Sequence, residues 1–206
     1  GLANLDVVLN LSPKVTLHDV FTGKRPLDEA LIEVCGFTVL LAGSGMVEYS
    51  RLTPEVRDKL IDTLNAVAPR FDRVLLDTGA GISDVVLYTV SLADEVLVVA
   101  TPEPTSLTDA YATIKVLAAQ QNRRSLRVVI NQILRAGDGR VIRGQLQAVV
   151  DRFVTPLDPA APVKLDLLGE IPSDPAVREA VKKRQLVLTL SPGAPAAQAF
   201  GALLRE

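Results

Sequence analysis

The sequence has little of the chemistry on which disulfides, zinc sites and hydrolase triads depend. Its 206 residues include one cysteine, one histidine and no tryptophan. The single cysteine, Cys35, excludes an internal disulfide and a cysteine-based zinc cluster, and it indicates a reducing compartment. With His18 as the sole histidine and no cysteine partner for it, neither a metal site at His18 nor a nucleophilic triad around Ser44 is expected. We expect Cys35 to be a small buried apolar residue.

The sequence also lacks an excess of one charge and any long apolar run. Its net charge is -2, from 22 basic and 24 acidic residues mixed along the chain, so charge alone indicates no direct nucleic-acid binding. No run reaches the roughly 18 apolar residues of a membrane span. A hydrophobic content of 48% with a mean hydropathy of +0.28 is nevertheless enough for a sizeable core. We expect a cytoplasmic protein with a single domain over residues 1–206.

Five short, almost continuous apolar runs predict strands that are buried on both faces. Strands of this kind are typical of a parallel sheet. The runs are FTVLLAG (37–43), RVLLDTG (73–79), EVLVVAT (95–101), LRVVIN (126–131) and KLDLLGE (164–170).

Helical patterns lie between these runs. Thr53 can cap the first, with Pro54 at the first helical position, and Ser106 and Asp109 have the spacing of a capping box. Residues 84–93 are β-branched, yet a helix is favoured there because the next strand follows without turn residues. The helices are expected within 53–69, 84–93, 106–120, 141–154 and 194–206. The alternation predicts an α/β fold, with a mainly parallel sheet flanked by helices and connected by right-handed crossovers.

Polar residues follow the predicted strands at their carboxyl ends, where ligands gather in open parallel sheets. Asp77 can hold Mg²⁺, often through water. The loop with Gly79 and Gly81 would turn backbone N–H groups and a helix amino end toward a phosphate. A tight turn at the two glycines, with Asp77 as a cap, is the purely structural alternative.

Three more predicted strands end in polar loops at the same edge. Thr101 and Glu103 follow one, Asn131 ends the next, and Asp174 lies in the loop after the last. Asn131 and Asp174 have the donors and acceptors needed to recognise the edge of a purine. Alternatively, each satisfies only its own backbone.

Five stretches of the sequence resemble the MinD/ParA family of deviant-Walker P-loop ATPases, most closely its regulators of flagellar number (the FlhG/FleN type). The resemblance covers nearly the whole chain, and DTGAGIS and TPEPTSLTDAY are its most specific parts. The stretches are GLANLDVVLNL, TLHDVFTGKRPLDEALIE, DTGAGIS, TPEPTSLTDAYATIKVL and GEIPSDPAVREAVKKRQLVLTLSPGAPAAQAF.

The resemblance implies an ATP- and Mg²⁺-dependent homodimer that closes face to face around two nucleotides. It implies that Asp77 is the second Walker aspartate near magnesium, and that Gly79, Ala80 and Gly81 form the switch loop that senses the γ-phosphate.

The resemblance also implies roles for residues after the later strands. Glu103, with Pro104, would lie near the dimer face and the partner's nucleotide. The adenine pocket would be lined by Asn131, Pro172 and Asp174. Asp109 would lie on a face used for dimer or partner contacts, unless it only caps its helix.

The chain lacks the family's glycine-rich loop, because no G-x-x-x-x-G-K-[ST] motif occurs in it. The resemblance places the first strand, the P-loop and the catalytic switch aspartate upstream of Gly1. No catalytic residue is therefore assigned, and we expect the chain as given neither to bind ATP tightly nor to hydrolyse it. It is either part of a longer ATPase or a natural remnant that keeps the fold and a binding face.

The expected function is control of flagellar number or placement through ATP-dependent dimerisation. The partner would be a flagellar assembly GTPase or a transcriptional regulator, at the cell pole or the periphery of the inner membrane. Membrane docking would use a further carboxyl-terminal helix, because residues 194–206 hold one basic residue and are expected to pack on the core. The alternatives are a septum-site or cargo-partition ATPase and a non-catalytic scaffold that binds its partner without nucleotide.

Overall fold

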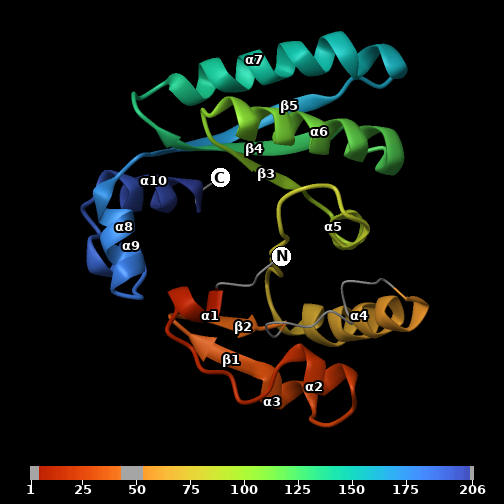
Figure 1. Ribbon diagram of the computed structural model, residues 1–206, viewed down its shortest axis with the longest axis vertical. Helices are drawn as coiled ribbons and strands as arrows, with labels where there is room; N and C mark the ends of the chain where they lie inside the picture. The colour runs from red at the N-terminus through yellow and green to blue at the C-terminus, as the bar shows by residue number, and fades with distance from the viewer. Residues whose placement is uncertain (1–4, 43–52, 205–206) are drawn as a thin grey trace. The chain divides into compact units, whose positions relative to one another are not determined.

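The computed structural model describes residues 5–42 and 53–204, which form two compact units (Figure 1). Unit 1 comprises residues 1–80 and 84–89, and unit 2 comprises residues 81–83 and 90–206. Helix α5 (Asp84–Ser91) begins in unit 1 and ends in unit 2, and it confirms the helix predicted within 84–93. Ser44 lies outside the described residues.

The buried residues of unit 1 include Phe21 of its second helix, Val39 of a strand and Val67 of its longest helix. Helix α4 begins as predicted, with Pro54 in its first turn and the Thr53 hydroxyl accepting a hydrogen bond from the Val56 N–H at 3.4 Å. The elements are α1 (Leu5–Val8), α2 (Leu17–Phe21), α3 (Leu27–Ala30), α4 (Pro54–Val67) and the 3₁₀ helix η2 (Ala68–Arg70).

The two strands of unit 1 form an antiparallel hairpin. β1 (Leu31–Val34) pairs with β2 (Phe37–Leu40), so the parallel strand predicted at 37–43 is wrong in its direction of pairing. Only Cys35 and Gly36 connect them, with φ of 51° and 86°, and a two-residue turn with positive φ can join only antiparallel neighbours. Because it lies at this turn, Cys35 is exposed rather than buried as predicted.

Residues 73–79 do not form the strand that their apolar pattern predicts. Leu75 is 92% exposed, although the pattern indicates a strand buried on both faces. A strand exists only through hydrogen bonds to a neighbour, and none of the strands in the described parts of the chain pairs with this segment. Its propensity alone therefore does not produce a strand.

Unit 2 contains a parallel three-stranded sheet, which confirms the predicted α/β class. β3 (Leu97–Ala100) and β5 (Lys164–Pro172) pair in parallel with the central β4 (Ser125–Ile133). Figure 1 shows α6 (Pro104–Gln121) and α7 (Asp138–Phe153) on one face of this sheet and α10 (Pro195–Leu203) on the other. The remaining elements are η3 (Thr155–Leu157), α8 (Pro175–Lys182) and α9 (Val187–Leu190).

The core of unit 2 lies on both faces of β4, as expected for a central parallel strand. On one face Val128 and Ile130 are fully buried with Ile114 and Leu117 of α6. On the other face α10 packs on a cluster of Val129, Ile171 and Ala196, together with Leu168, Val177, Ala199, Phe200 and Leu203. This contact confirms that the last helix packs on the core.

The start of α6 differs from its prediction. The helix begins at Pro104 with Glu103 as its N-cap, so Ser106 and Asp109 form no capping box. The Ser106 hydroxyl instead accepts a hydrogen bond from the Thr101 N–H at 2.9 Å. The reason is Pro104, which suits the first helical position and moves the N-cap three residues upstream, from Ser106 to Glu103. None of the helices within the described residues is long and apolar enough to cross a membrane.

Candidate functional site

The strands of unit 2 bring three loops to one edge, because parallel strands share the direction of their carboxyl ends. Ala100 pairs with Ile130, Asn131 pairs with Ile171, and Ile133 pairs with Pro172. Asn131 and Pro172 are thus carried to adjacent positions by neighbouring strands. The sequence prediction that these loops share an edge is confirmed for β3, β4 and β5.

The loop between β3 and α6 is held by its own polar side chains. Thr101 donates its N–H to Ser106, and the Thr101 hydroxyl accepts from the Glu103 N–H at 3.4 Å. Glu103 is exposed at the amino end of α6, where the partial positive charge of the helix favours a carboxylate. The helix start therefore presents a carboxylate at this edge of the sheet.

Asn131 is half-buried where β4 becomes irregular. Its side-chain oxygen accepts a hydrogen bond from the Gln132 N–H at 2.8 Å. Gln132 has φ of 59°, in the left-handed region, and the pairing with β5 shifts register there. The bond uses one acceptor position of the Asn131 amide, whose oxygen has a second lone pair and whose nitrogen is a donor.

Asp174 joins two helices of unit 2. Its Oδ1 accepts from the Ala176 N–H at 2.8 Å at the start of α8, and its Oδ2 accepts from the Ala196 N–H at 3.0 Å in the first turn of α10. Both carboxylate oxygens therefore satisfy helix N–H groups that have no partner within their own helix. Asp174 therefore satisfies the backbone near it in the chain, as the structural alternative stated, and it also satisfies the backbone of α10.

Glu170 lies near the same edge of the sheet, and the sequence patterns did not identify it. It lies on β5, and its two oxygens accept the N–H groups of Gly137 at 2.7 Å and Gly139 at 2.9 Å, at the start of α7. This clamp fixes the loop that follows Asn131 onto the strand that ends at Pro172. The one sequence signal for this contact was the pair of glycines in RAGDGR. Glycine has no side chain, so a carboxylate can approach its backbone closely.

The residues around Asp77 form a second group with a different local structure. Asp77, Gly79 and Ala80 belong to unit 1 and Gly81 to unit 2. Asp77 is exposed, and Gly81 has φ of 97°, a conformation that favours glycine. The described residues contain no group of three potential metal ligands. One carboxylate suits Mg²⁺ only where waters or phosphates supply the other ligands.

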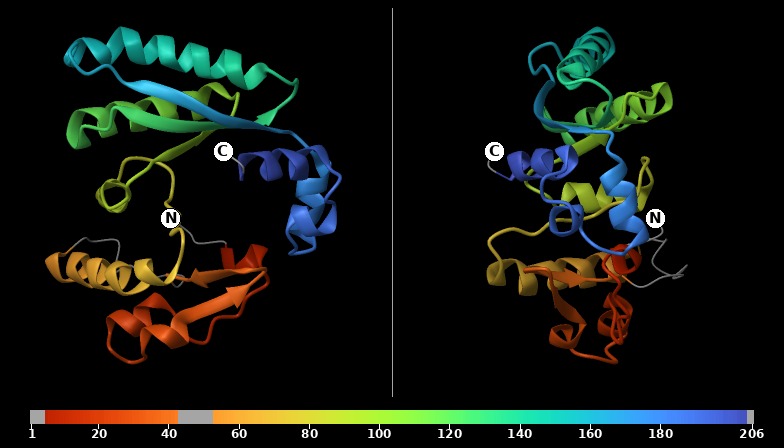
Figure 2. Two further views of the ribbon diagram at one scale, coloured as in Figure 1. Left: turned by 180° about the vertical axis from the view of Figure 1, so that it is seen from behind. Right: turned by 90° about the vertical axis from the view of Figure 1, so that its left-hand side faces the viewer.

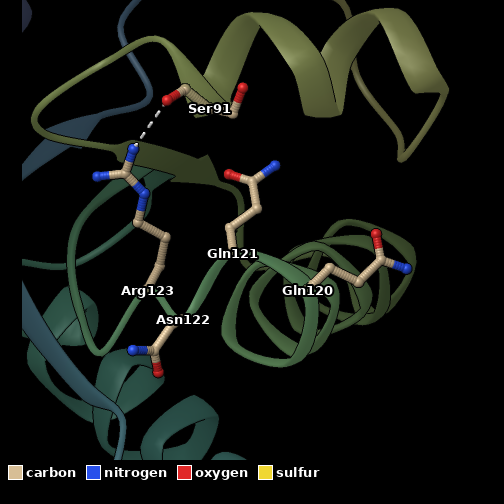
Figure 3. Close-up of a pocket in the computed structure, with 5 residues that line it drawn as sticks. All are labelled: Ser91, Gln120, Gln121, Asn122 and Arg123. Atoms are coloured by element: carbon tan, nitrogen blue, oxygen red, sulfur yellow. Dashed lines mark hydrogen bonds between the residues drawn. The ribbon is translucent and has the colours of Figure 1, made fainter.

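A polar depression of about 460 Å³ lies at the carboxyl end of α6, away from the candidate residues at its amino end. It is lined by Ser91, Gln120, Gln121, Asn122 and Arg123 (Figure 3). The Arg123 guanidinium donates to the carbonyl oxygens of Val90, Ser91, Ala93 and Asp94. These bonds satisfy carbonyls at the end of α5, so we interpret the depression as structural.

Comparison with known proteins identifies relatives over the full length of the chain. The antiactivator FleN of Pseudomonas aeruginosa is 38% identical over 207 residues, which cover all of this chain and 71% of the relative. No family model matches the chain.

Solved structures share the fold. The MinC:MinD cell division complex of Aquifex aeolicus contains a chain that is 26% identical, with a TM-score of 0.71, covering 100% of this chain and 78% of that one. The septum site-determining protein MinD of Pyrococcus horikoshii, complexed with Mg-ADP, is 24% identical with a TM-score of 0.68, covering 98% and 77%.

Proposed function

Because the chain belongs to the MinD/ParA family of ATPases, we propose that it regulates flagellar number or placement through ATP-dependent dimerisation and partner binding. The observation that carries this proposal is the 38% identity to a flagellar antiactivator over the whole chain. The partner would be a flagellar assembly GTPase or a transcriptional regulator, in the cytoplasm or at the periphery of the inner membrane. We treat the two units as parts of one ATPase-like domain.

The purine end of the nucleotide would bind at the edge formed by β4 and β5. Asn131 and Pro172 occupy paired strands there, and Asp174 follows directly. The Asn131 amide can donate to and accept from a base, and each Asp174 oxygen keeps a lone pair beside its helix-capping bond. These donors and acceptors fit an adenine ring, which presents both an amine and ring nitrogens on one edge.

This chain has fewer residues that could bind the phosphate end of the nucleotide than residues that could bind its purine end. Asp77 would lie near Mg²⁺, and Gly79, Ala80 and Gly81 would form the loop that responds to the γ-phosphate. Glu103 and Pro104, at the start of α6, would lie at the dimer face. When bound, Mg-ATP supplies the phosphoryl group and the charge of the metal, but the glycine-rich loop that normally holds the phosphates does not occur in this sequence.

We therefore infer that the chain as given neither binds ATP tightly nor hydrolyses it. The carboxylate of Asp77 alone cannot replace the backbone N–H groups and the lysine of a P-loop. An ATPase assay of the chain and of its Asp77→Asn variant tests this inference. Turnover that disappears in the variant would contradict it.

Two other functions remain as alternatives. A septum-site role is favoured by the likeness to the MinD chain of the MinC:MinD cell division complex, and a cargo-partition role is the other alternative within the family. A non-catalytic scaffold, which binds its partner without nucleotide, is the alternative from a different functional class.

Deletion of the gene in its own host separates these functions. The flagellar proposal predicts an altered number or position of flagella, counted by electron microscopy, with normal septum placement. Misplaced septa with normal flagella would support the septum-site alternative. Restoration of normal flagella by a gene whose protein cannot bind nucleotide would support the scaffold.

A further inference from the structure

A basic surface lies on α8 and on the residues that follow it. Arg178, Lys182, Lys183 and Arg184 are all exposed. Glu179 is the one acidic residue between them, and its carboxylate pairs with Lys182 at 2.9 Å. Four cations and one anion leave a net charge of +3 over residues 178–184, in a chain whose total charge is -2.

These positive charges act on the same region of space. The pKa of Glu179 is lowered by a hydrogen bond from Lys182 and by the charges of Lys182, Lys183 and Arg178. A carboxylate that responds to three cations lies within their common field. Arg178, Lys182 and Lys183 are therefore a cluster in space as well as in sequence, and Arg184 follows Lys183 directly.

The packing of α8 fixes which of its faces meets solvent. Ala180 is buried, Val177 packs against the Val129 cluster, and Asp174 holds the start of the helix to α10. Figure 2 shows α8 and α9 side by side near the end of β5, and the two helices contact each other. The basic side chains are thus held on the outside of unit 2 by the core on the other side of α8.

Aliphatic side chains are exposed among these charges. Val181 is 51% exposed and lies three residues after Arg178, on the same side of the helix. Leu188, on α9, is 42% exposed. Exposed aliphatic groups within a basic cluster can enter the boundary between lipid headgroups and acyl chains.

We propose that the surface formed by Arg178, Val181, Lys182, Lys183, Arg184 and Leu188, the basic α8 surface, binds the anionic headgroups of a membrane. Clusters of four or more basic residues on an amphipathic helix are typical of anionic lipid recognition. The proposal rests on the membrane location in the proposed function and assigns it a surface on α8. No residue of this surface belongs to the candidate nucleotide site, so failure of vesicle binding and failure of nucleotide binding are separate results.

Two other classes of partner fit the surface less well. Single-stranded nucleic acid is bound with the help of aromatic side chains, and residues 173–192 contain none. Protein interfaces are depleted in lysine, whereas two of the four cations here are lysines. Lysine and arginine with exposed aliphatic neighbours are instead the composition of segments that lie on anionic membranes.

Cosedimentation of the chain with lipid vesicles tests the proposal. Vesicles of phosphatidylcholine with about 30% phosphatidylglycerol should bind the chain, pure phosphatidylcholine should not, and raised salt should weaken the binding. The test variant carries Arg178→Gln, Lys182→Gln, Lys183→Gln and Arg184→Gln. Each basic residue near an anionic surface contributes on the order of fivefold in affinity, so this variant should bind at least about tenfold more weakly.

A matched control removes the same charge from other parts of unit 2. It carries Lys115→Gln, Arg135→Gln, Arg140→Gln and Arg152→Gln, all at exposed positions of unit 2. The control should keep most of the binding, and Val181→Ser with Leu188→Ser should weaken it even at low salt. Failure to bind the anionic vesicles, or equal loss in the test variant and the control, would overturn the proposal. Binding to a short DNA duplex in place of vesicles, with loss in the test variant alone, would overturn the assignment to lipid.

Discussion

Gly139 lies so close to Glu170 that a Cβ atom added to the glycine would sit 2.5 Å from Oε2 of the glutamate. The same carboxylate accepts the N–H groups of Gly137 and Gly139, so the contact is part of the clamp that fixes the start of α7. The clamp joins the start of α7, which follows the β4 strand of Asn131, to the β5 strand that ends at Pro172, so it supports the candidate purine edge.

The substitution Gly139→Ala should therefore destabilise the chain. We expect a loss of about 1–3 kcal/mol in the free energy of unfolding, the usual cost of overpacking, measured by urea denaturation. Gly144→Ala in the same helix is the matched control, because its Cβ would meet no atom within 4 Å. That variant should be unchanged or more stable by up to about 1 kcal/mol. Equal effects of the two substitutions would contradict the clamp.

Asp174 should contribute to stability through both of its carboxylate oxygens. Asp174→Ala removes the hydrogen bonds to Ala176 and Ala196 and should cost about 1–2 kcal/mol, as the loss of a helix cap does. Asp174→Asn keeps one acceptor oxygen, so its free energy of unfolding, measured by urea denaturation, should lie between that of Asp174→Ala and that of the unmodified chain. If Asp174→Ala leaves stability unchanged, the residue is available for ligand binding alone.

Arg123 should stabilise the end of α5. Its guanidinium donates to four backbone carbonyls, a geometry that the ammonium of lysine cannot reproduce. We expect Arg123→Lys to lower the free energy of unfolding by about 1 kcal/mol and Arg123→Met by about 2 kcal/mol. Hydrogen exchange at residues 85–96 should accelerate in both variants. Unchanged exchange there would show that the carbonyls do not depend on the guanidinium.

Asp19 should make part of the stability depend on pH. The backbone N–H and hydroxyl of Thr16 donate to its carboxylate at 2.9 Å and 3.1 Å, and they lower its pKa. Because the pKa is lower in the folded state, the stabilisation is complete above the unfolded pKa of about 3.9 and is lost as the pH falls through the folded value.

The variant Asp19→Asn tests this dependence by thermal denaturation. Its melting temperature should lie below that of the unmodified chain at neutral pH, and the difference should shrink below about pH 4. Thr16→Ala keeps the backbone donor, so it should lose only part of the effect. A difference that is the same at neutral and acidic pH would contradict the role given to the Asp19 carboxylate.

The sequence predicted the parts of the fold that depend on local signals, such as helix caps and apolar runs. Thr53 and Pro54 start α4 as expected, and the runs around Val98, Val128 and Leu165 became parallel strands because each had a neighbour to pair with. Residues 73–79 have the same apolar pattern, but hydrogen-bonded pairing is not encoded in a segment by itself. The burial of Cys35 was predicted from its residue type. Its position beside Gly36 in a two-residue turn instead makes it exposed.

The candidate site was predictable to a similar degree. The positions of Glu103, Asn131, Pro172 and Asp174 at one edge follow from the ends of parallel strands. The Glu170 clamp was not predictable, because it joins residues that are 31 and 33 positions apart. The roles of these edge residues, Glu103, Asn131, Pro172 and Asp174, toward a nucleotide are proposals.

The central proposal is that this chain carries the purine side of a MinD/ParA nucleotide site but not the phosphate side. The most direct test is the binding of a fluorescent ATP analogue with Mg²⁺ to this chain, beside the same gene extended upstream through any glycine-rich loop. We predict that only the extended protein binds the analogue and that Asn131→Ala weakens its binding. Equal affinity of the two proteins would contradict the proposal, because the phosphates would then be held by residues of this chain.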